Sequence, residues 1–215
     1  MERRSFFSRL AAAGALLGLG PASAAASTAG EGAIAGSFEA ARHEQDAWFD
    51  SLPGTHRIIF DTWTHERFRE GVQFAGNYFR ANKDAYSLTD KDLAVIMGVR
   101  HHTQPFAFND AMWAKYGKHF SARMLFTDPQ TKQAPTTNLL GAQLTALVKQ
   151  GMQFSICNLT TRAYTKIISD ATGTSQDDVY KELQANTLGP AHFVPAGVVG
   201  VSRAQERGYT LIAIG

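Results

Sequence analysis

The sequence predicts an α/β fold, a three-layer sandwich in which helices cover both faces of a five-stranded parallel sheet. Short apolar runs alternate with amphipathic helical segments from residue 56 to the end of the chain. Strands separated by helices imply right-handed crossovers, and such crossovers join parallel strands. The run LAVIMGV at residues 93–99 has little polar alternation, which is typical of a parallel strand covered on both faces.

The first elements expected along the chain are a helix, a strand and a second helix. In residues 37–52 apolar side chains recur at helical spacing behind Ser37, a candidate N-cap, and Pro53-Gly54 ends the segment. We expect this amphipathic arm to dock on the domain or on a neighbouring subunit. Residues 56–63 are expected to form a strand. The helix after it places four apolar residues on one face: Phe68, Val72, Ala75 and Phe79.

The remaining elements alternate in the same way. Strands are expected at 93–99, 152–157, 192–194 and 209–214. Helices are expected at 106–116, 138–150, from 158 onward, behind Ser175, and from Pro195 to Arg207. Ser175 is a favoured N-cap type, and the two aspartates in the next turn suit the positive end of the helix dipole. The segment 117–137 is long for a connection and is expected to be a lid, an interface or a surface loop without a role.

The N-terminal segment is typical of a twin-arginine export signal. Arg3 and Arg4 precede a weakly apolar stretch, and small residues follow, with cleavage expected after Ala24 or Ala26. The apolar stretch is about half the roughly 20 residues that a membrane span needs, so we expect no span in the mature form. The sequence thus divides into a signal at 1–26, an arm at 27–54 and an α/β domain at 55–215, and it predicts a periplasmic protein.

Charge and cysteine content narrow the function classes. The net charge is +2, and removal of the predicted signal takes three arginines and one glutamate with it, which leaves a balanced chain. A balanced chain offers no electrostatic argument for nucleic-acid binding. The only cysteine, Cys157, has no second thiol for an internal disulfide.

Candidate site residues follow three of the predicted strands. His65 comes after the first strand, His101 and His102 after the second, and Cys157 ends the third. Ligands of open parallel sheets bind at the carboxyl ends of the strands, so we expect these side chains to share one crevice. Adjacent residues at a strand end point in opposite directions, so we expect at most one of the two neighbouring histidines to face it.

Cys157 is the candidate nucleophile. A thiol reacts as thiolate, a form that a helix N-terminus and an imidazolium both stabilise. We expect the cap of the next helix at Asn158, Thr160 or Thr161, with free backbone N–H groups directed at the sulfur. Asn158, Thr160 and His65 are the candidate ligand-binding residues. The alternative is that the cysteine is a small buried hydrophobe.

Cofactor signatures are absent from the sequence. No Gly-x-Gly-x-x-Gly follows a strand, so no dinucleotide cofactor is expected. A Cys/His metal-binding protein is a further alternative, because one thiol and two or three imidazoles suffice for a metal centre. No pair of ligands has metal-binding spacing, and no metal residue is assigned.

Three segments together resemble the DsrE/DsrF-like proteins of sulfur relay. They are "RHHTQPFAFNDAMWAKYG" from Arg100, "LVKQGMQFSICNLTTRAY" with Cys157, and "HFVPAGVVGVSRAQERGYTLIAIG" at the end of the chain. The similarity covers about residues 56–215. It implies a five-stranded α/β sandwich, a homo-oligomer of three or six copies, and sulfur carried as a persulfide on Cys157, with His101 or His102 assisting.

Two departures from the family accompany the resemblance. The relay proteins act in the cytoplasm in heteromeric sets, whereas this chain has an export signal, and the segment 117–137 exceeds the short form. The sequence therefore predicts a periplasmic, sulfurtransferase-like sulfur carrier whose partners are small sulfur species or a thiol protein. The alternative from another class is a non-catalytic oligomeric binding or scaffold protein of the same fold.

Overall fold

Residues 39–215 are described by a computed structural model of the chain. The expected signal at 1–26, its cleavage site and the proposed cap Ser37 lie outside these residues. Residues 40–215 form one compact unit. Within the described part of the chain, no helix combines the length and apolarity that crossing a bilayer requires.

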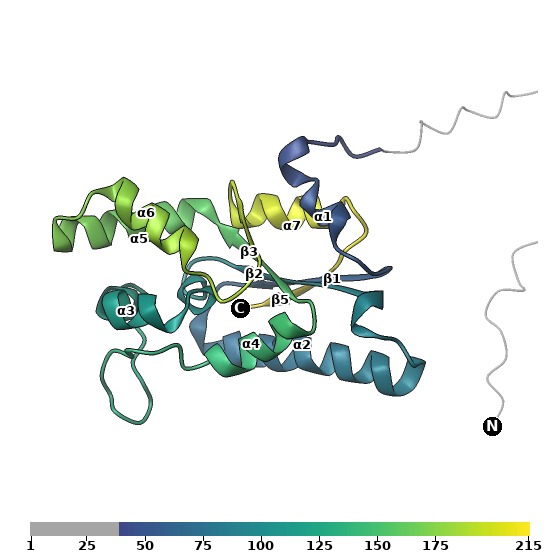
Figure 1. Cartoon of the computed structure of the whole chain (residues 1–215), viewed down its shortest axis with the longest axis horizontal. Coiled ribbons are helices and arrows are strands. Elements are labelled where there is room, and N and C mark those ends of the chain that lie inside the picture. Colours follow the sequence, from purple (N-terminus) through teal and green to yellow (C-terminus); the bar gives the residue numbers. More distant parts are fainter. Residues whose placement is uncertain (1–38) are drawn as a thin grey trace, which may run out of the picture. The chain divides into compact units, whose positions relative to one another are not determined.

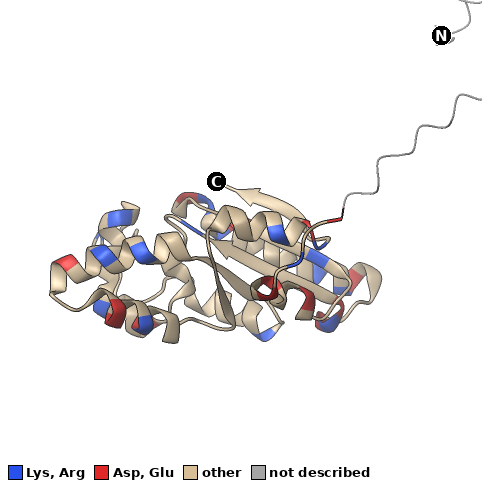
Figure 2. Cartoon of the chain, turned by 90° about the horizontal axis from the view of Figure 1, so that it is seen from above, with Lys and Arg blue, Asp and Glu red and all other residues tan. Residues whose placement is uncertain are grey.

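The centre of the unit is a five-stranded sheet (Figure 1). Its strands are β1 (His56–Thr62), β2 (Leu93–Val99), β3 (Gln153–Cys157), β4 (Ala191–Val194) and β5 (Thr210–Ile214). All four neighbouring pairs are parallel, in the order β4-β3-β2-β1-β5. Strands β2 to β5 contain no Lys, Arg, Asp or Glu (Figure 2). The expected α/β class and the five-stranded parallel sheet are confirmed.

Helices cover the two faces of the sheet unequally (Figure 1). The larger core packs side chains such as Phe60 and Val95 against α2 (His65–Tyr86), α3 (Asp110–Met124), α4 (Gly141–Lys149), α5 (Asn158–Thr172) and α6 (Gln176–Ala185). The smaller core packs Ile59 and Ile96 on the other face against α1 (Trp48–Ser51) and α7 (Gly197–Gln205). Short 3-10 helices lie at Glu44–Asp46, Asp90–Asp92 and Gln104–Ala107.

The long N-terminal helix expected over residues 37–52 is wrong for the described part of that range. Only the 3-10 turn Glu44–Asp46 and the four-residue α1 form there. Tertiary contacts determine the path instead, because Phe49 is fully buried in the smaller core and its carbonyl accepts a 2.6 Å hydrogen bond from the Tyr209 hydroxyl. The segment packs on the domain, which is the first of the two docking places expected for the arm.

The helix expected to end at Tyr116 runs eight residues further, to Met124. The first part of the expected 117–137 insertion is therefore helical. Gly117 sits inside α3 without ending it. A Cβ at this position would collide with the carbonyl oxygen of Pro135. The absence of a side chain at Gly117 lets the following loop pack closely on the helix.

The remaining helix boundaries differ by a few residues. Helix α4 begins at Gly141, three residues after the expected start, because the Asn138 amide bonds the carbonyls of Phe106 and Phe108 and fixes the preceding turn. Helix α7 begins at Gly197 and not at Pro195. The expected cap of α6 is confirmed, since the Ser175 hydroxyl accepts the N–H of Asp178.

Candidate functional site

The structure places the four principal candidates at the carboxyl edge of the sheet. Cys157 is the last residue of β3, and His101 and His102 lie in the turn that directly follows β2. His65 is the first residue of α2, three positions beyond the end of β1. Their shared edge follows from the parallel direction of all strands.

Cys157 itself is buried, with 5% of its surface exposed. It is the N-cap residue of α5, because the chain passes from β3 into the helix without a connecting residue. The expectation that Asn158, Thr160 or Thr161 caps this helix is wrong. The sulfur makes no capping hydrogen bond to the helix N–H groups. Its donor is the Thr160 hydroxyl, at 3.3 Å from Sγ.

The backbone of His101 is held by the first two turns of α5. Its N–H donates to the Thr160 hydroxyl oxygen at 3.3 Å, and its carbonyl accepts the Tyr164 hydroxyl at 3.2 Å. His101 has a φ of 49°, in the left-handed region that a residue with a Cβ adopts at a cost. Thr160 thus joins this strained turn to the sulfur of Cys157.

The electrostatic surroundings of His101 favour a neutral ring. Partial burial lowers the pKa of the imidazole, and the adjacent positive charge of Arg100 lowers it further. A neutral imidazole at pH 7 gives a nearby thiolate no full positive charge. The environment therefore does not favour the role expected for an imidazolium at this position.

His65 and His102 form a separate pair. Their ring centroids are 6.2 Å apart, and His65 also packs edge-on against Phe126 at 5.2 Å. Burial lowers the pKa of His65; Glu66 opposes that effect and His102 adds to it. Among the described residues, neither imidazole makes a hydrogen bond to Cys157 or Thr160. The structure brings these two histidines to the same edge of the sheet, without a hydrogen bond from either ring to the sulfur in the described residues.

Asn158, expected to bind a ligand, faces the neighbouring helix. Its side-chain oxygen accepts a 2.9 Å hydrogen bond from the Tyr180 hydroxyl of α6. The Arg162 guanidinium lies over the Tyr180 ring, at 3.6 Å from its centroid. The contact joins α5 to α6, which is a structural use of this amide.

Gln104, which no sequence pattern singles out, is fully buried beside the cysteine backbone. In the orientation that satisfies both ends of its amide, the nitrogen donates to the Cys157 carbonyl at 2.9 Å. The amide oxygen then accepts the Thr161 N–H at 3.1 Å. Gln104 fixes the main chain at the junction of β3 and α5, and no local motif could have predicted it.

Arg100 and Asp61 form an ion pair that sequence patterns do not predict. The guanidinium makes two hydrogen bonds of 3.0 Å to the carboxylate and lies over the Trp63 ring, at 4.7 Å from its centroid. Val99 pairs in register with Ile156, so Arg100 follows on the strand next to Cys157. The guanidinium of Arg100 is thus paired with the carboxylate of Asp61 on the strand beside Cys157.

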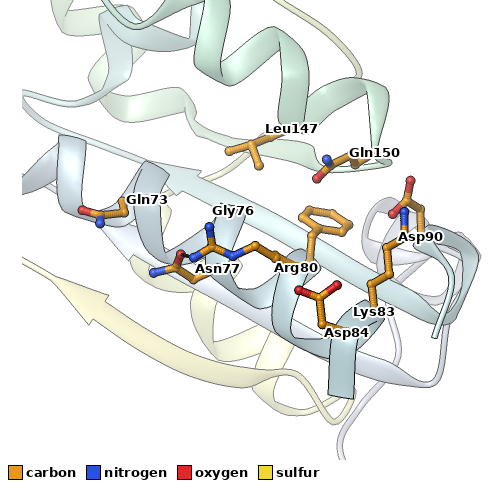
Figure 3. A pocket seen from close by; sticks show the side chains of 10 residues that line it. Gln73, Gly76, Asn77, Arg80, Lys83, Asp84, Asp90, Leu147 and Gln150 are labelled. Carbon is orange, nitrogen blue, oxygen red and sulfur yellow. Dashed lines mark hydrogen bonds between the residues drawn. The ribbon is translucent and has the colours of Figure 1, made fainter. Parts of the chain in front are cut away.

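Two cavities of the described residues lie away from Cys157 and the histidines. One of about 590 Å³ opens between α2 and α4, with Arg80, Lys83 and Gln150 among its lining residues (Figure 3). A second, of about 880 Å³, lies beside α4 and the start of α3. Neither is lined by a predicted site residue. Over residues 39–215, no group of three or more His, Cys, Asp or Glu side chains is arranged to hold a metal ion.

Comparison with known proteins adds a distant structural likeness. No family model matches the chain, and no curated protein matches it either. A solved structure, of the protein of unknown function MTH1491 from Methanobacterium thermoautotrophicum, is similar over 74% of this chain and 99% of that chain. The sequence identity is 16% and the TM-score is 0.43. The likeness carries no functional argument.

Proposed function

We propose that this chain is an exported DsrE-like sulfur carrier, in which Cys157 accepts sulfane sulfur from a small sulfur species and passes it to a partner thiol. The quoted segments support the family, and the paired arginines support export to the periplasm. The observation that carries the proposal is the Thr160 hydroxyl, which donates to the Sγ of Cys157 at a strand end. Hydrogen bonds with an ionised partner are the strong ones, and the Thr160 hydroxyl is placed to donate one when the sulfur carries the negative charge of the reaction.

The loading step is a displacement at sulfur. With thiosulfate as donor, the Cys157 thiolate attacks the outer sulfur and a new S–S bond forms. The S–S bond of thiosulfate breaks, and sulfite leaves with the bonding electrons. The product is a persulfide, which a partner thiolate attacks in turn.

Burial sets a condition on this chemistry. With 5% of Cys157 exposed, a donor reaches the sulfur only when its cover opens. The turn after β2 is connected to the sulfur through Thr160, so opening of that turn is the motion that the proposal requires. Loading is then expected to be slower than at an exposed thiol.

Intact-mass measurement tests the proposal. The mature protein is incubated with thiosulfate or polysulfide, desalted and weighed, with Cys157→Ser as the matched control. Wild type is expected to gain the mass of one sulfur atom, which cyanide removes, and Cys157→Ser is expected to gain nothing. A wild-type protein that gains no sulfur contradicts the proposal.

The same burial favours a second candidate function, a non-catalytic binding or scaffold protein in which Cys157 is a core side chain. Free cysteines are among the most buried residue types. In that case Cys157→Ser leaves partner binding and assembly unchanged, and the native thiol resists alkylation until the protein unfolds. Alkylation of native and urea-unfolded protein distinguishes the two candidates.

A further inference from the structure

The sheet has one protected edge and one open edge. At the β4 edge Pro190 and Pro195 flank the strand, and the Trp48 ring stacks on His192 at 3.9 Å. Proline has no N–H for pairing, so this edge resists a further strand. At the opposite edge β5 pairs with β1, and no other strand among residues 39–215 pairs with it.

The open edge carries apolar side chains. Strand β5 has the sequence Thr-Leu-Ile-Ala-Ile, and 36% of Ile212 is exposed. Ile212 pairs in register with Phe60, a residue of the core beneath α2, so its side chain lies on the α2 face. An uncharged edge strand without proline or lysine is a ready template for pairing.

Helix α2 adds a second apolar side chain beside Ile212. Gly71 packs on the edge strand, since a Cβ there would lie 3.6 Å from the Ile214 side chain. Phe74 follows one turn later on the same side of α2 and is 42% exposed. Because α2 runs antiparallel to the strands, this turn brings Phe74 near the level of Ile212. We name these two exposed side chains the β5 patch.

We propose that the β5 patch is a two-fold interface, in which β5 pairs antiparallel with β5 of a second copy about an axis near Ile212. Such a pairing extends the sheet across two copies and places each Ile212 beside its counterpart. The protected β4 edge disfavours head-to-tail pairing, in which β4 of one copy would pair with β5 of the next. The pairing that remains is the closed two-fold contact between two β5 strands.

The absence of charged residues on β5 favours a second copy of this chain over a charged peptide as the partner of the β5 patch. No residue of β5 is charged. The nearest charges on this side of α2, Arg67 and Glu70, form an ion pair of 2.6 Å with each other. Two identical patches therefore meet without an unpaired like charge, while a charged strand finds no partner there. This inference is independent of the chemistry of Cys157.

The test is the mass of the mature chain in solution, measured by light scattering after gel filtration. Wild type is expected to be a dimer or an even-numbered assembly. Ile212→Lys is expected to halve its mass, because two lysines would face each other across the axis. Tyr86→Lys, at a residue that is 72% exposed at the end of α2, is the matched control and is expected to retain the wild-type mass.

A second variant protects the test against misfolding. Phe74→Lys changes an exposed helix position, so it is expected to keep the native circular dichroism spectrum and to give the same half mass. A wild-type protein that is monomeric or trimeric overturns the proposal. So does retention of the full mass by a folded Ile212→Lys or Phe74→Lys variant.

Discussion

The hydroxyl of Thr160 donates a hydrogen bond of 3.3 Å to the Sγ of Cys157. The same oxygen accepts the N–H of His101, also at 3.3 Å. A hydroxyl that accepts one hydrogen bond is a better donor in the next, because neighbouring bonds in a chain polarise each other. The three residues therefore form a short relay from the turn after β2 to the only sulfur nucleophile of the chain.

Replacing Thr160 by valine is expected to slow alkylation of Cys157 by about tenfold at pH 7. A hydrogen bond to a charged group contributes about 1.5–3 kcal/mol, and each 1.4 kcal/mol is about a factor of ten. Thr160→Ser keeps the hydroxyl and is expected to retain most of the wild-type rate. The rate is measured with iodoacetamide in excess. Equal rates for the valine and serine variants would show that the hydroxyl does not support the thiolate.

His101→Gly is expected to raise the free energy of unfolding by about 0.5–1 kcal/mol, because glycine adopts a φ of 49° without the Cβ penalty. His101→Ala keeps the Cβ and is expected to bring no such gain. Urea unfolding measures both. Ser87→Gly is the matched control, because Ser87 follows α2 with a φ of 57° in the same left-handed region. It is expected to bring a similar gain in the free energy of unfolding. A loss of stability in His101→Gly alone would mean that the imidazole contributes more than the strain costs.

Gly197→Ala is expected to lower the free energy of unfolding by about 1–3 kcal/mol, the cost typical of overpacking. A Cβ at Gly197 would lie 2.7 Å from Cδ of Arg100, so the guanidinium must move from Asp61. Gly76→Ala is the control, because its nearest contact would be Leu147 at 3.9 Å. In the interior of α2 that change is expected to stabilise by roughly 0.5–1 kcal/mol. Effects of the same sign at both positions would contradict the packing argument.

Stability is expected to fall as the pH is lowered from about 7 to 5. Burial lowers the pKa of His192 below its ordinary value, so the unfolded state binds protons more readily than the folded state. The unfolding free energy therefore decreases as the pH falls through about 6.5, and it levels off below the folded-state pKa. His192→Phe keeps an aromatic ring beside Trp48 and is expected to flatten this slope in urea titrations.

Part of the slope is expected to persist in His192→Phe, because burial also lowers the pKa of His65, His101 and His119. An unchanged slope in His192→Phe would exclude this histidine as the source.

The strands could be predicted from the sequence because their determinants are local. The run 93–99 is apolar throughout, and the Ser175 cap depends on a residue three positions away. The path of residues 44–52 could not be predicted, since Phe49 is held by Tyr209, a residue 160 positions distant. The packing of Pro135 against Gly117 likewise joins two segments that local patterns do not relate.

In the candidate site, too, the positions of the residues along the strands were predictable and their supporting contacts were not. Parallel strands were enough to bring Cys157 and the histidines to one edge. The supporting contacts were not predictable, because Gln104 and the Arg100–Asp61 pair act through the folded arrangement of separate elements. The sequence named Thr160 as a ligand-binding residue, whereas in the structure its hydroxyl bonds the sulfur itself.

Sulfur loading of Cys157 in the folded protein decides whether the chain is a sulfur carrier. After exposure to thiosulfate or polysulfide, the protein is blocked with iodoacetamide, digested and analysed by mass spectrometry. One extra sulfur is expected on the peptide that contains Cys157, and none in Cys157→Ser or after treatment with cyanide. An unmodified Cys157 peptide from natively folded protein, under conditions that load an exposed thiol, would contradict the account.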